Sequence, residues 1–123
     1  MSKSILVTGG TKGIGKAIII RFASQGFDIF TCSRNEEDLS SLKSELESSY
    51  PEISVFVKQA DLSKKEEVEK FASFVKKEGI PDVMVNNTGL FLPGAILDEP
   101  DGNFELMMET NLFSAYYLTR AFA

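Results

Sequence analysis

Four glycines stand directly after a short apolar run near the start of the chain: Gly9, Gly10, Gly13 and Gly15. The apolar run, residues 5–7, is β-prone and too short for a helix, whereas apolar residues recur at helical spacing from Ile14 to Phe22. Residues 4–15 therefore predict a strand, a glycine loop and the start of a helix. Glycine lets a backbone approach a ligand closely, and the free N–H groups of a helix start suit a phosphate. The alternative is a tight turn that binds nothing.

The side chains that most often bind metals or act as nucleophiles are scarce. The 123 residues include no histidine and a single cysteine, Cys32. This composition excludes the usual zinc sites, histidine-based catalytic triads and an internal disulfide. The net charge of −5 argues against a nucleic-acid-binding surface. A lone thiol fits a reducing compartment, and we find neither a signal peptide nor an apolar run of membrane length, so we expect a cytoplasmic protein with no membrane partner.

Helices and strands are expected to alternate along the rest of the chain. The pattern predicts further strands over residues 27–32, 53–57 and 82–87, and helices over 13–25, 36–49 and from 64 up to Gly79. Asn35 is the expected N-cap of the second helix, and residues 63–66 have the form of a capping box for the third. Such alternation predicts an α/β fold with a doubly wound parallel sheet and right-handed crossovers. In these sheets, ligands bind at the carboxyl ends of the strands.

The last element, from about residue 101 onward, has apolar side chains all round a helix. A helix of this kind must be buried on several sides. The pattern reaches Ala123 without a glycine or another helix stop. We therefore expect a sheet truncated after its fourth strand and the following helix, so that residues 1–123 are the N-terminal part of a longer single domain.

Residues 8–15 read TGGTKGIG, which resembles the T-G-x-x-x-G-x-G cofactor motif of the short-chain dehydrogenases/reductases. Further along, residues 86–89 read NNTG, which is similar to the family's N-N-A-G with threonine in place of alanine. The resemblance covers essentially the whole chain and implies a Rossmann-like fold, with residues 1–123 as its dinucleotide-binding region. It also implies hydride transfer between a nicotinamide cofactor and a ketone, an aldehyde or an alcohol.

The end of the second expected strand bears on the choice of coenzyme. Dinucleotide folds that select NAD place a carboxylate there, whereas an arginine accommodates the 2′-phosphate of NADP. This sequence has Ser33 followed by Arg34, with Lys12 in the glycine loop as a second cation. Glu36 and Glu37 lie nearby but are explained as acids in the first turn of a helix. We predict NADP(H) in preference to NAD(H); the alternative is a pair of solvated surface cations.

The resemblance also assigns roles to later residues. It implies that Asp61 accepts a hydrogen bond from the adenine amino group, for which loop capping is the alternative. It implies that Asn111 distorts its helix and holds a water of the proton relay, for which a satisfied core asparagine is the alternative. Asn111 is the one predicted catalytic residue. The predicted cofactor-binding residues are Gly9, Thr11, Lys12, Gly13, Ile14, Gly15, Ser33, Arg34, Asp61, Leu62, Asn87, Thr88 and Gly89.

The catalytic half of the family pattern is not found in these 123 residues. The family uses a serine and a Y-x-x-x-K pair that follow the asparagine helix. Tyr116 and Arg120 have the spacing of that pair, but they lie on the asparagine helix itself, and arginine is a poor proton-relay partner. We therefore expect residues 1–123 to be inactive alone.

Two functions follow from these expectations. The first is an NADP(H)-dependent oxidoreductase with a small-molecule carbonyl or alcohol substrate. The second is a natural short form that binds a nucleotide or a partner without catalysis, using the apolar last helix as an interface. In either case we expect a homo-oligomer formed through the last helix or regions beyond it.

Overall fold

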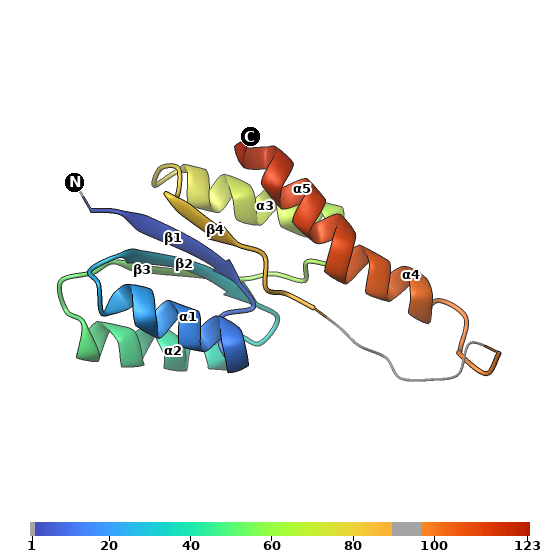
Figure 1. The fold of residues 1–123 in the computed structure, drawn as a ribbon, viewed down its shortest axis with the longest axis horizontal. Coiled ribbons are helices and arrows are strands. Elements are labelled where there is room, and N and C mark those ends of the chain that lie inside the picture. The colour runs from blue at the N-terminus through green and yellow to red at the C-terminus, as the bar shows by residue number, and fades with distance from the viewer. Residues whose placement is uncertain (1, 90–96) are drawn as a thin grey trace.

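The computed structural model describes residues 2–89 and 97–123. Four strands form one sheet in which all pairs are parallel: β1 (Ser4–Thr8), β2 (Asp28–Ser33), β3 (Val55–Gln59) and β4 (Val83–Val85). Their order across the sheet is β3-β2-β1-β4 (Figure 1). The chain thus runs outward from β1 to β3 and then crosses back to place β4 on the other side of β1. The predicted α/β fold with a parallel sheet is confirmed. The sequence after Gly89 also predicts a loop containing Pro93, Gly94 and Pro100, and of these Pro93 and Gly94 lie outside the described residues.

Two layers of helices cover the sheet. The helices are α1 (Gly13–Ala23), α2 (Glu36–Ser49), α3 (Lys65–Lys76), α4 (Asn103–Met108) and α5 (Ser114–Phe122). Figure 1 shows α1 and α2 on one face of the sheet and α3 and α5 on the other. Because successive side chains of a strand point to opposite faces, Ile5 and Val7 of β1 join the core beneath α1 and α2, whereas Leu6 joins the core beneath α3 and α5.

The N-terminal end of α2 is capped as predicted. The side-chain oxygen of Asn35 accepts a hydrogen bond from the backbone N–H of Asp38 at 3.0 Å. The predicted capping box on residues 63–66 is wrong, because the hydroxyl of Ser63 donates to the Asp61 carboxylate instead, at 2.7 Å. No side chain caps α3, which begins after Lys64. The helix begins one residue later than the box requires, and the Ser63 backbone N–H that would pair with Glu66 donates to the Asp61 carboxylate at 3.0 Å.

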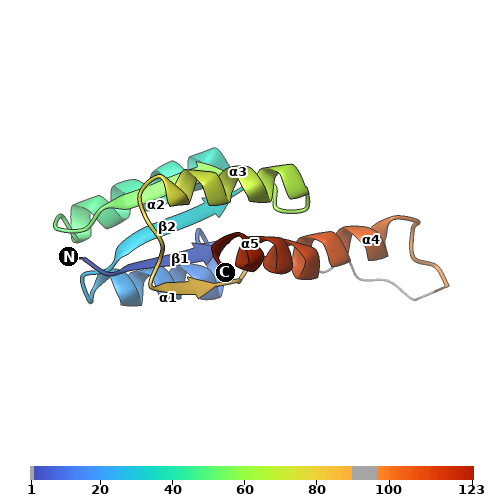
Figure 2. The same cartoon turned by 90° about the horizontal axis from the view of Figure 1, so that it is seen from above.

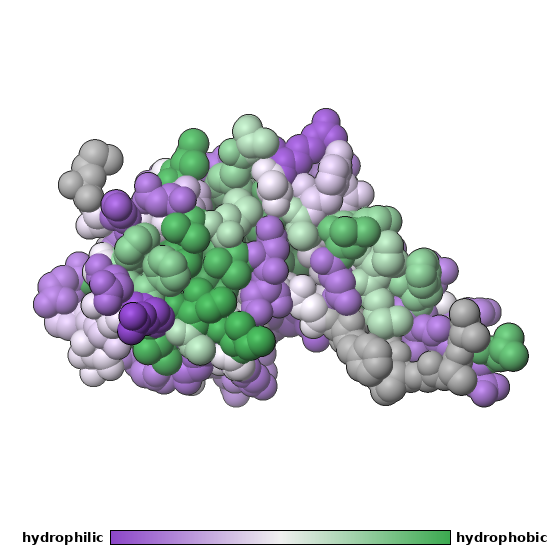
Figure 3. All heavy atoms as spheres, viewed as in Figure 1, coloured by the Kyte–Doolittle hydropathy of each residue, from purple (hydrophilic) through white to green (hydrophobic). Residues whose placement is uncertain are grey.

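The last helical segment differs from the prediction. It consists of α4, a π-helical turn over Glu109–Phe113, and α5. Phe104 is 60% exposed and Tyr116 is 56% exposed, and only Ser114 and Leu118 of this segment are buried. Figure 3 shows the resulting apolar surface along α4 and α5.

The cover on several sides that this helix was expected to need is not supplied within the described part of the chain. The physical reason is that α5 packs on α3 through one stripe around Leu118. Seen from above, α4 continues past the end of the sheet (Figure 2). Among residues 2–89 and 97–123, no helix is both long and apolar enough to cross a membrane.

Candidate functional site: a pocket at the carboxyl ends of the strands

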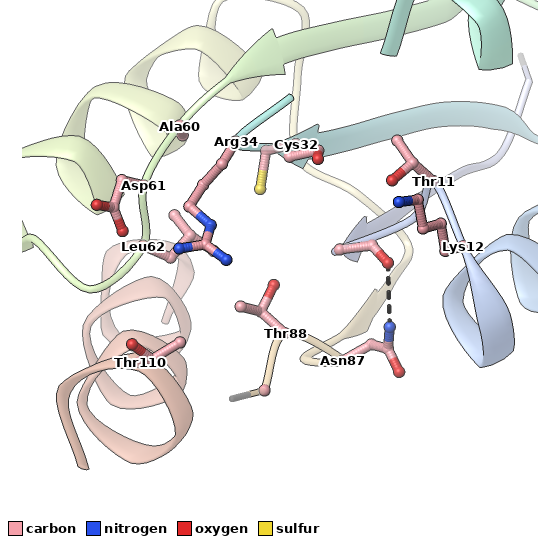
Figure 4. Close-up of a pocket in the computed structure, with 13 residues that line it drawn as sticks. Thr11, Lys12, Cys32, Arg34, Ala60, Asp61, Leu62, Asn87, Thr88 and Thr110 are labelled. Carbon is pink, nitrogen blue, oxygen red and sulfur yellow. Dashed lines mark hydrogen bonds between the residues drawn. The ribbon is translucent and has the colours of Figure 1, made fainter. Parts of the chain in front are cut away.

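A pocket of about 320 Å³ opens at the carboxyl ends of the strands, where the parallel sheet was expected to bind a ligand. It collects residues from the loops that follow all four strands and one residue from the π-helical turn. The lining residues are Gly9, Thr11, Lys12, Cys32, Ser33, Arg34, Ala60, Asp61, Leu62, Asn87, Thr88, Gly89 and Thr110 (Figure 4). Its volume lies in the range typical of small-molecule sites.

Hydrogen bonds join the glycine loop to the segment after β4. The hydroxyl of Thr8 accepts from the backbone N–H groups of Asn87, at 2.9 Å, and Thr88, at 3.0 Å. The side-chain amide of Asn87 in turn donates to the carbonyl of Gly9 at 3.2 Å (Figure 4). One wall of the pocket is therefore fixed to β1 by three bonds that cross about 80 residues of sequence.

Close packing at Gly15 makes this connection possible. A Cβ at Gly15 would stand 2.5 Å from both the Asn87 amide nitrogen and the Gly9 carbonyl oxygen. These are the two atoms whose bond joins the loops. A side chain at Gly15 would therefore push the two loops apart.

Two cations lie on the side of the pocket formed by β2 and the glycine loop. Arg34 extends from the end of β2 toward Leu62 and Thr88 (Figure 4), and its carbonyl accepts a hydrogen bond from the Gln59 side chain at 3.0 Å. Lys12 has a side chain that is 81% exposed, and its ammonium lies 3.5 Å from the Asp38 carboxylate. No carboxylate of the described residues lies within ion-pair distance of Arg34.

Asp61 lies after β3, beside Arg34 and at the other end of the pocket from Lys12 (Figure 4). Desolvation alone would raise the pKa of its carboxyl group. Hydrogen bonds from the hydroxyl and the backbone N–H of Ser63, together with the charges of Arg34 and Lys64, outweigh that effect and lower the pKa below its ordinary value. Asp61 is therefore a carboxylate at neutral pH, which can accept hydrogen bonds but cannot donate one.

Cys32 lies at the end of β2 and is almost completely buried, although it contributes to the pocket lining. Burial raises the pKa of its thiol to about 12, an effect that the nearby backbone N–H of Gly9 opposes only in part. Because the thiolate is the reactive form of cysteine, this thiol is chemically inert at neutral pH.

Three lining residues are absent from the predicted set: Cys32, Ala60 and Thr110. Each directly precedes a residue that the sequence did predict, namely Ser33, Asp61 and Asn111. That adjacency is the one sequence signal that could have identified them, since a pocket wall built from a turning backbone exposes consecutive residues.

Four predicted residues do not line the pocket: Gly13, Ile14, Gly15 and Asn111. The first three form the N-terminal end of α1, and the Ile14 side chain is 74% exposed. Asn111 lies in the π-helical turn, as the expected helix distortion implies. Its side-chain oxygen is 3.7 Å from the position that a Cβ of Gly89 would take, so Asn111 stands next to the pocket rim.

The described residues offer little support for a metal site or for proton transfer by the Tyr116–Arg120 pair. They contain no group of three or more histidine, cysteine, aspartate or glutamate side chains that could hold a metal ion. Arg120 donates a hydrogen bond to the Tyr116 hydroxyl at 3.2 Å, but neither residue lines the pocket. The arrangement is therefore suited to binding an anionic, hydrogen-bonding ligand.

Comparisons with known proteins indicate the family to which the chain belongs. At 32% identity over 123 residues, the chain is similar to an NADPH-dependent pterin aldehyde reductase of Arabidopsis thaliana, with 98% of this chain and 50% of the relative covered. The crystal structure of an L-sorbose reductase from Gluconobacter frateurii with NADPH and L-sorbose superposes with a TM-score of 0.92 at 27% identity, covering 98% of this chain and 46% of the other.

An alcohol dehydrogenase from the archaeon Thermococcus sibiricus, complexed with 5-hydroxy-NADP, gives a TM-score of 0.93 at 31% identity. The alignment covers 99% of this chain and 52% of the dehydrogenase. The chain thus spans about half the length of the relatives it matches. The family model for short chain dehydrogenases matches residues 3–123, and the chain therefore belongs to the short-chain dehydrogenase family.

Proposed function

We propose that residues 1–123 are the cofactor-binding part of an NADP(H)-dependent oxidoreductase that interconverts an alcohol and a ketone or aldehyde. The observation that carries this proposal is that two cations, Arg34 and Lys12, line the same pocket. Ser33, which also lines it, occupies the place where NAD-selecting folds have an acid. A 2′-phosphate is a dianion at neutral pH, and a charge-assisted hydrogen bond to it is among the stronger contacts a protein makes.

The pocket and the adjoining N-terminal end of α1 together offer a place for each part of a dinucleotide. The N-terminal end of α1, with the backbone N–H groups of Gly13, Ile14 and Gly15, suits the pyrophosphate. Asp61 and Leu62 suit the adenine, and the segment Asn87-Thr88-Gly89 suits a ribose. When bound, the nicotinamide would supply or accept a hydride. Asn111, next to Gly89, is the described residue best placed to order a water for proton transfer.

The substrate class comes from the relatives. Their names include a pterin aldehyde reductase and an L-sorbose reductase, so we infer a small carbonyl compound or the corresponding alcohol. We also infer that residues 1–123 belong to one longer domain in a cytoplasmic protein. The exposed apolar side chains of α4 and α5, such as Phe104 and Tyr116, would be covered by the rest of that domain or by a second copy of the chain.

A second candidate function is a non-catalytic protein that binds a nucleotide or a partner. The same exposed apolar face along α4 and α5 favours it, because such a surface serves equally well as an interface.

Titration with NADPH and NADH tests the coenzyme proposal, and an assay of NADPH oxidation with a panel of small carbonyl compounds separates the two functions. We expect NADPH to bind at least about tenfold more tightly than NADH, since one charge-assisted hydrogen bond is enough for that difference. We expect no turnover by residues 1–123 alone and turnover by a polypeptide that includes the family's serine and Y-x-x-x-K. Equal affinity for the two coenzymes would contradict the NADP(H) proposal, and a natural protein that binds NADPH without turning over any carbonyl would favour the second function.

A further inference from the structure

Four hydrogen bonds to Asp61 fix the loop that follows β3. Its backbone N–H donates to the Glu67 carboxylate at 2.7 Å, although the two residues are six positions apart. Its carbonyl accepts from the backbone N–H of Lys64 at 3.2 Å. One oxygen of its carboxylate, Oδ1, accepts from both the backbone N–H and the hydroxyl of Ser63, at 3.0 and 2.7 Å. In the described part of the chain, the second oxygen, Oδ2, is left without a hydrogen bond.

Glu67 is the long-range member of this arrangement. It lies in the first turn of α3, and α3 is anchored in the core by Val68 and Phe71, which are almost fully buried. The other bonds to Asp61 come from residues of the same short turn, which could move with it. Among the described residues bonded to Asp61, Glu67 is the one that lies within a helix, and its bond to the Asp61 backbone is partly buried.

We propose that Glu67 is a positioning residue for recognition of the adenine base. By holding the Asp61 backbone against α3, it keeps the free carboxylate oxygen of Asp61 at the pocket edge, where that oxygen accepts a hydrogen bond from the adenine amino group. This inference rests on the proposed function, since it concerns the base of the proposed dinucleotide.

The chemistry of the carboxylate makes the site selective for one base over another. A carboxylate only accepts hydrogen bonds, so it attracts the 6-amino group of adenine and repels the 6-carbonyl oxygen of hypoxanthine. The charge of the neighbouring Arg34 favours the ionised state of Asp61. Discrimination between the two bases therefore depends on where Oδ2 lies, and a shift of the loop by an ångström would weaken it.

The experiment compares binding of NADPH with that of its hypoxanthine analogue, in which the 6-amino group is replaced by oxygen, to the full-length natural protein. The wild type is expected to favour NADPH by about tenfold or more, as for a charge-assisted hydrogen bond. Glu67→Ala removes the acceptor, and Glu67→Asp keeps the charge of the first helical turn but is shorter by one methylene. Both are expected to reduce the preference to within about threefold, whereas Glu67→Gln keeps an acceptor oxygen and should retain most of it.

Glu66→Ala is the matched control. Glu66 is an exposed acid in the same first turn of α3 and is not among the hydrogen-bond partners of Asp61. Its loss should leave the base preference unchanged. Glu67→Asp serves if Glu67→Ala does not fold, because aspartate is well tolerated in a first turn.

Either of two results with the variants would overturn the inference. One is an unchanged base preference in Glu67→Ala and Glu67→Asp; the other is an equal weakening of both nucleotides, which would give Glu67 a purely structural role. A wild-type protein that binds NADPH and its analogue equally would also overturn it while leaving the proposed function intact. A wild-type protein that binds neither nucleotide would instead contradict the proposed function itself.

Discussion

The hydroxyl of Thr8 accepts a hydrogen bond from the backbone N–H of Asn87 at 2.9 Å, which joins the end of β1 to the segment after β4. The same oxygen accepts from Thr88 at 3.0 Å. Thr8 is 2% exposed, so water cannot readily replace it. One buried hydroxyl therefore sets the distance between the glycine loop and the opposite wall of the pocket.

Replacing Thr8 by valine tests this relationship. Valine has nearly the same shape but offers no acceptor to Asn87 and Thr88. We expect Thr8→Val to lower the free energy of unfolding by about 2 kcal/mol, because two backbone donors lose their partner in a partly buried place. Urea denaturation measures the change, and Thr8→Ser, which keeps the hydroxyl, should lose distinctly less. Equal stability of the valine variant and the wild type would show that the two donors find other partners.

The two glycines at the start of α1 are expected to differ in their tolerance of alanine. A Cβ at Gly15 would stand 2.5 Å from the Gly9 carbonyl oxygen and the Asn87 amide nitrogen, so Gly15→Ala must separate the two loops. At Gly13, no atom lies within 4 Å of the added Cβ, and the cost is limited to its left-handed backbone at φ 56°. We expect about 1 kcal/mol of destabilisation for Gly13→Ala, from the backbone conformation alone. Thermal unfolding should show a larger loss for Gly15→Ala, and the reverse order would contradict the packing argument.

Local signals account for most of what the sequence predicts correctly. Strands are recognised from short β-prone runs, and the Asn35 cap follows from its position before three acids. The parallel topology then places the polar loops at one end of the sheet. This is why most of the predicted cofactor-binding residues line a single pocket, although their contact with a cofactor remains a prediction.

The wrong predictions involve competition between partners that sequence spacing does not reveal. Ser63 has the spacing of a capping box, but its backbone N–H and hydroxyl both donate to the Asp61 carboxylate, and α3 begins one residue later than the box requires. The apolar side chains around the last helix indicate that the helix requires burial, but they do not identify the surface that buries it. In the described residues, the stripe around Leu118 packs on α3, whereas large apolar side chains such as Phe104 and Tyr116 are exposed.

The buried thiol of Cys32 predicts a specific alkaline dependence of stability. Burial raises its pKa from 9.0 to about 12 in the folded protein, so between these values the unfolded chain releases a proton that the folded chain retains. This contribution is fully present below pH 9 and is lost as the pH rises toward 12, at up to about 1.4 kcal/mol per pH unit. Other groups also titrate there, so the measurement is the difference between the wild type and Cys32→Ala.

Urea denaturation at pH 7, 8, 9 and 10 provides that difference. The free energy of unfolding of the wild type should fall more steeply above pH 9 than that of Cys32→Ala, and the two curves should run parallel below pH 8. Parallel curves throughout would mean that the thiol ionises equally well in the folded protein and is not protected by burial.

Arg34 and Lys12 are expected to contribute unequally to coenzyme preference. Arg34 points into the pocket and forms no ion pair with the described carboxylates, whereas Lys12 is 81% exposed and already lies 3.5 Å from Asp38. Arg34→Asp should therefore weaken NADPH binding by about ten- to a hundredfold, the range of one charge-assisted hydrogen bond, and leave NADH binding nearly unchanged. Lys12→Met should weaken NADPH binding by only about threefold, because exposed charges are screened by solvent.

Fluorescence titration with both nucleotides measures these effects, and Lys16→Met provides the control. Lys16 lies on α1, pairs with Glu45 at 3.2 Å and does not line the pocket, so its loss should affect neither nucleotide. Raising the salt concentration should reduce the NADPH preference of the wild type, since it screens the attraction between the 2′-phosphate and the cations. If Arg34→Asp weakened NADPH and NADH equally, Arg34 would be holding the pocket together rather than reading the 2′-phosphate, and the coenzyme preference would have to come from another residue.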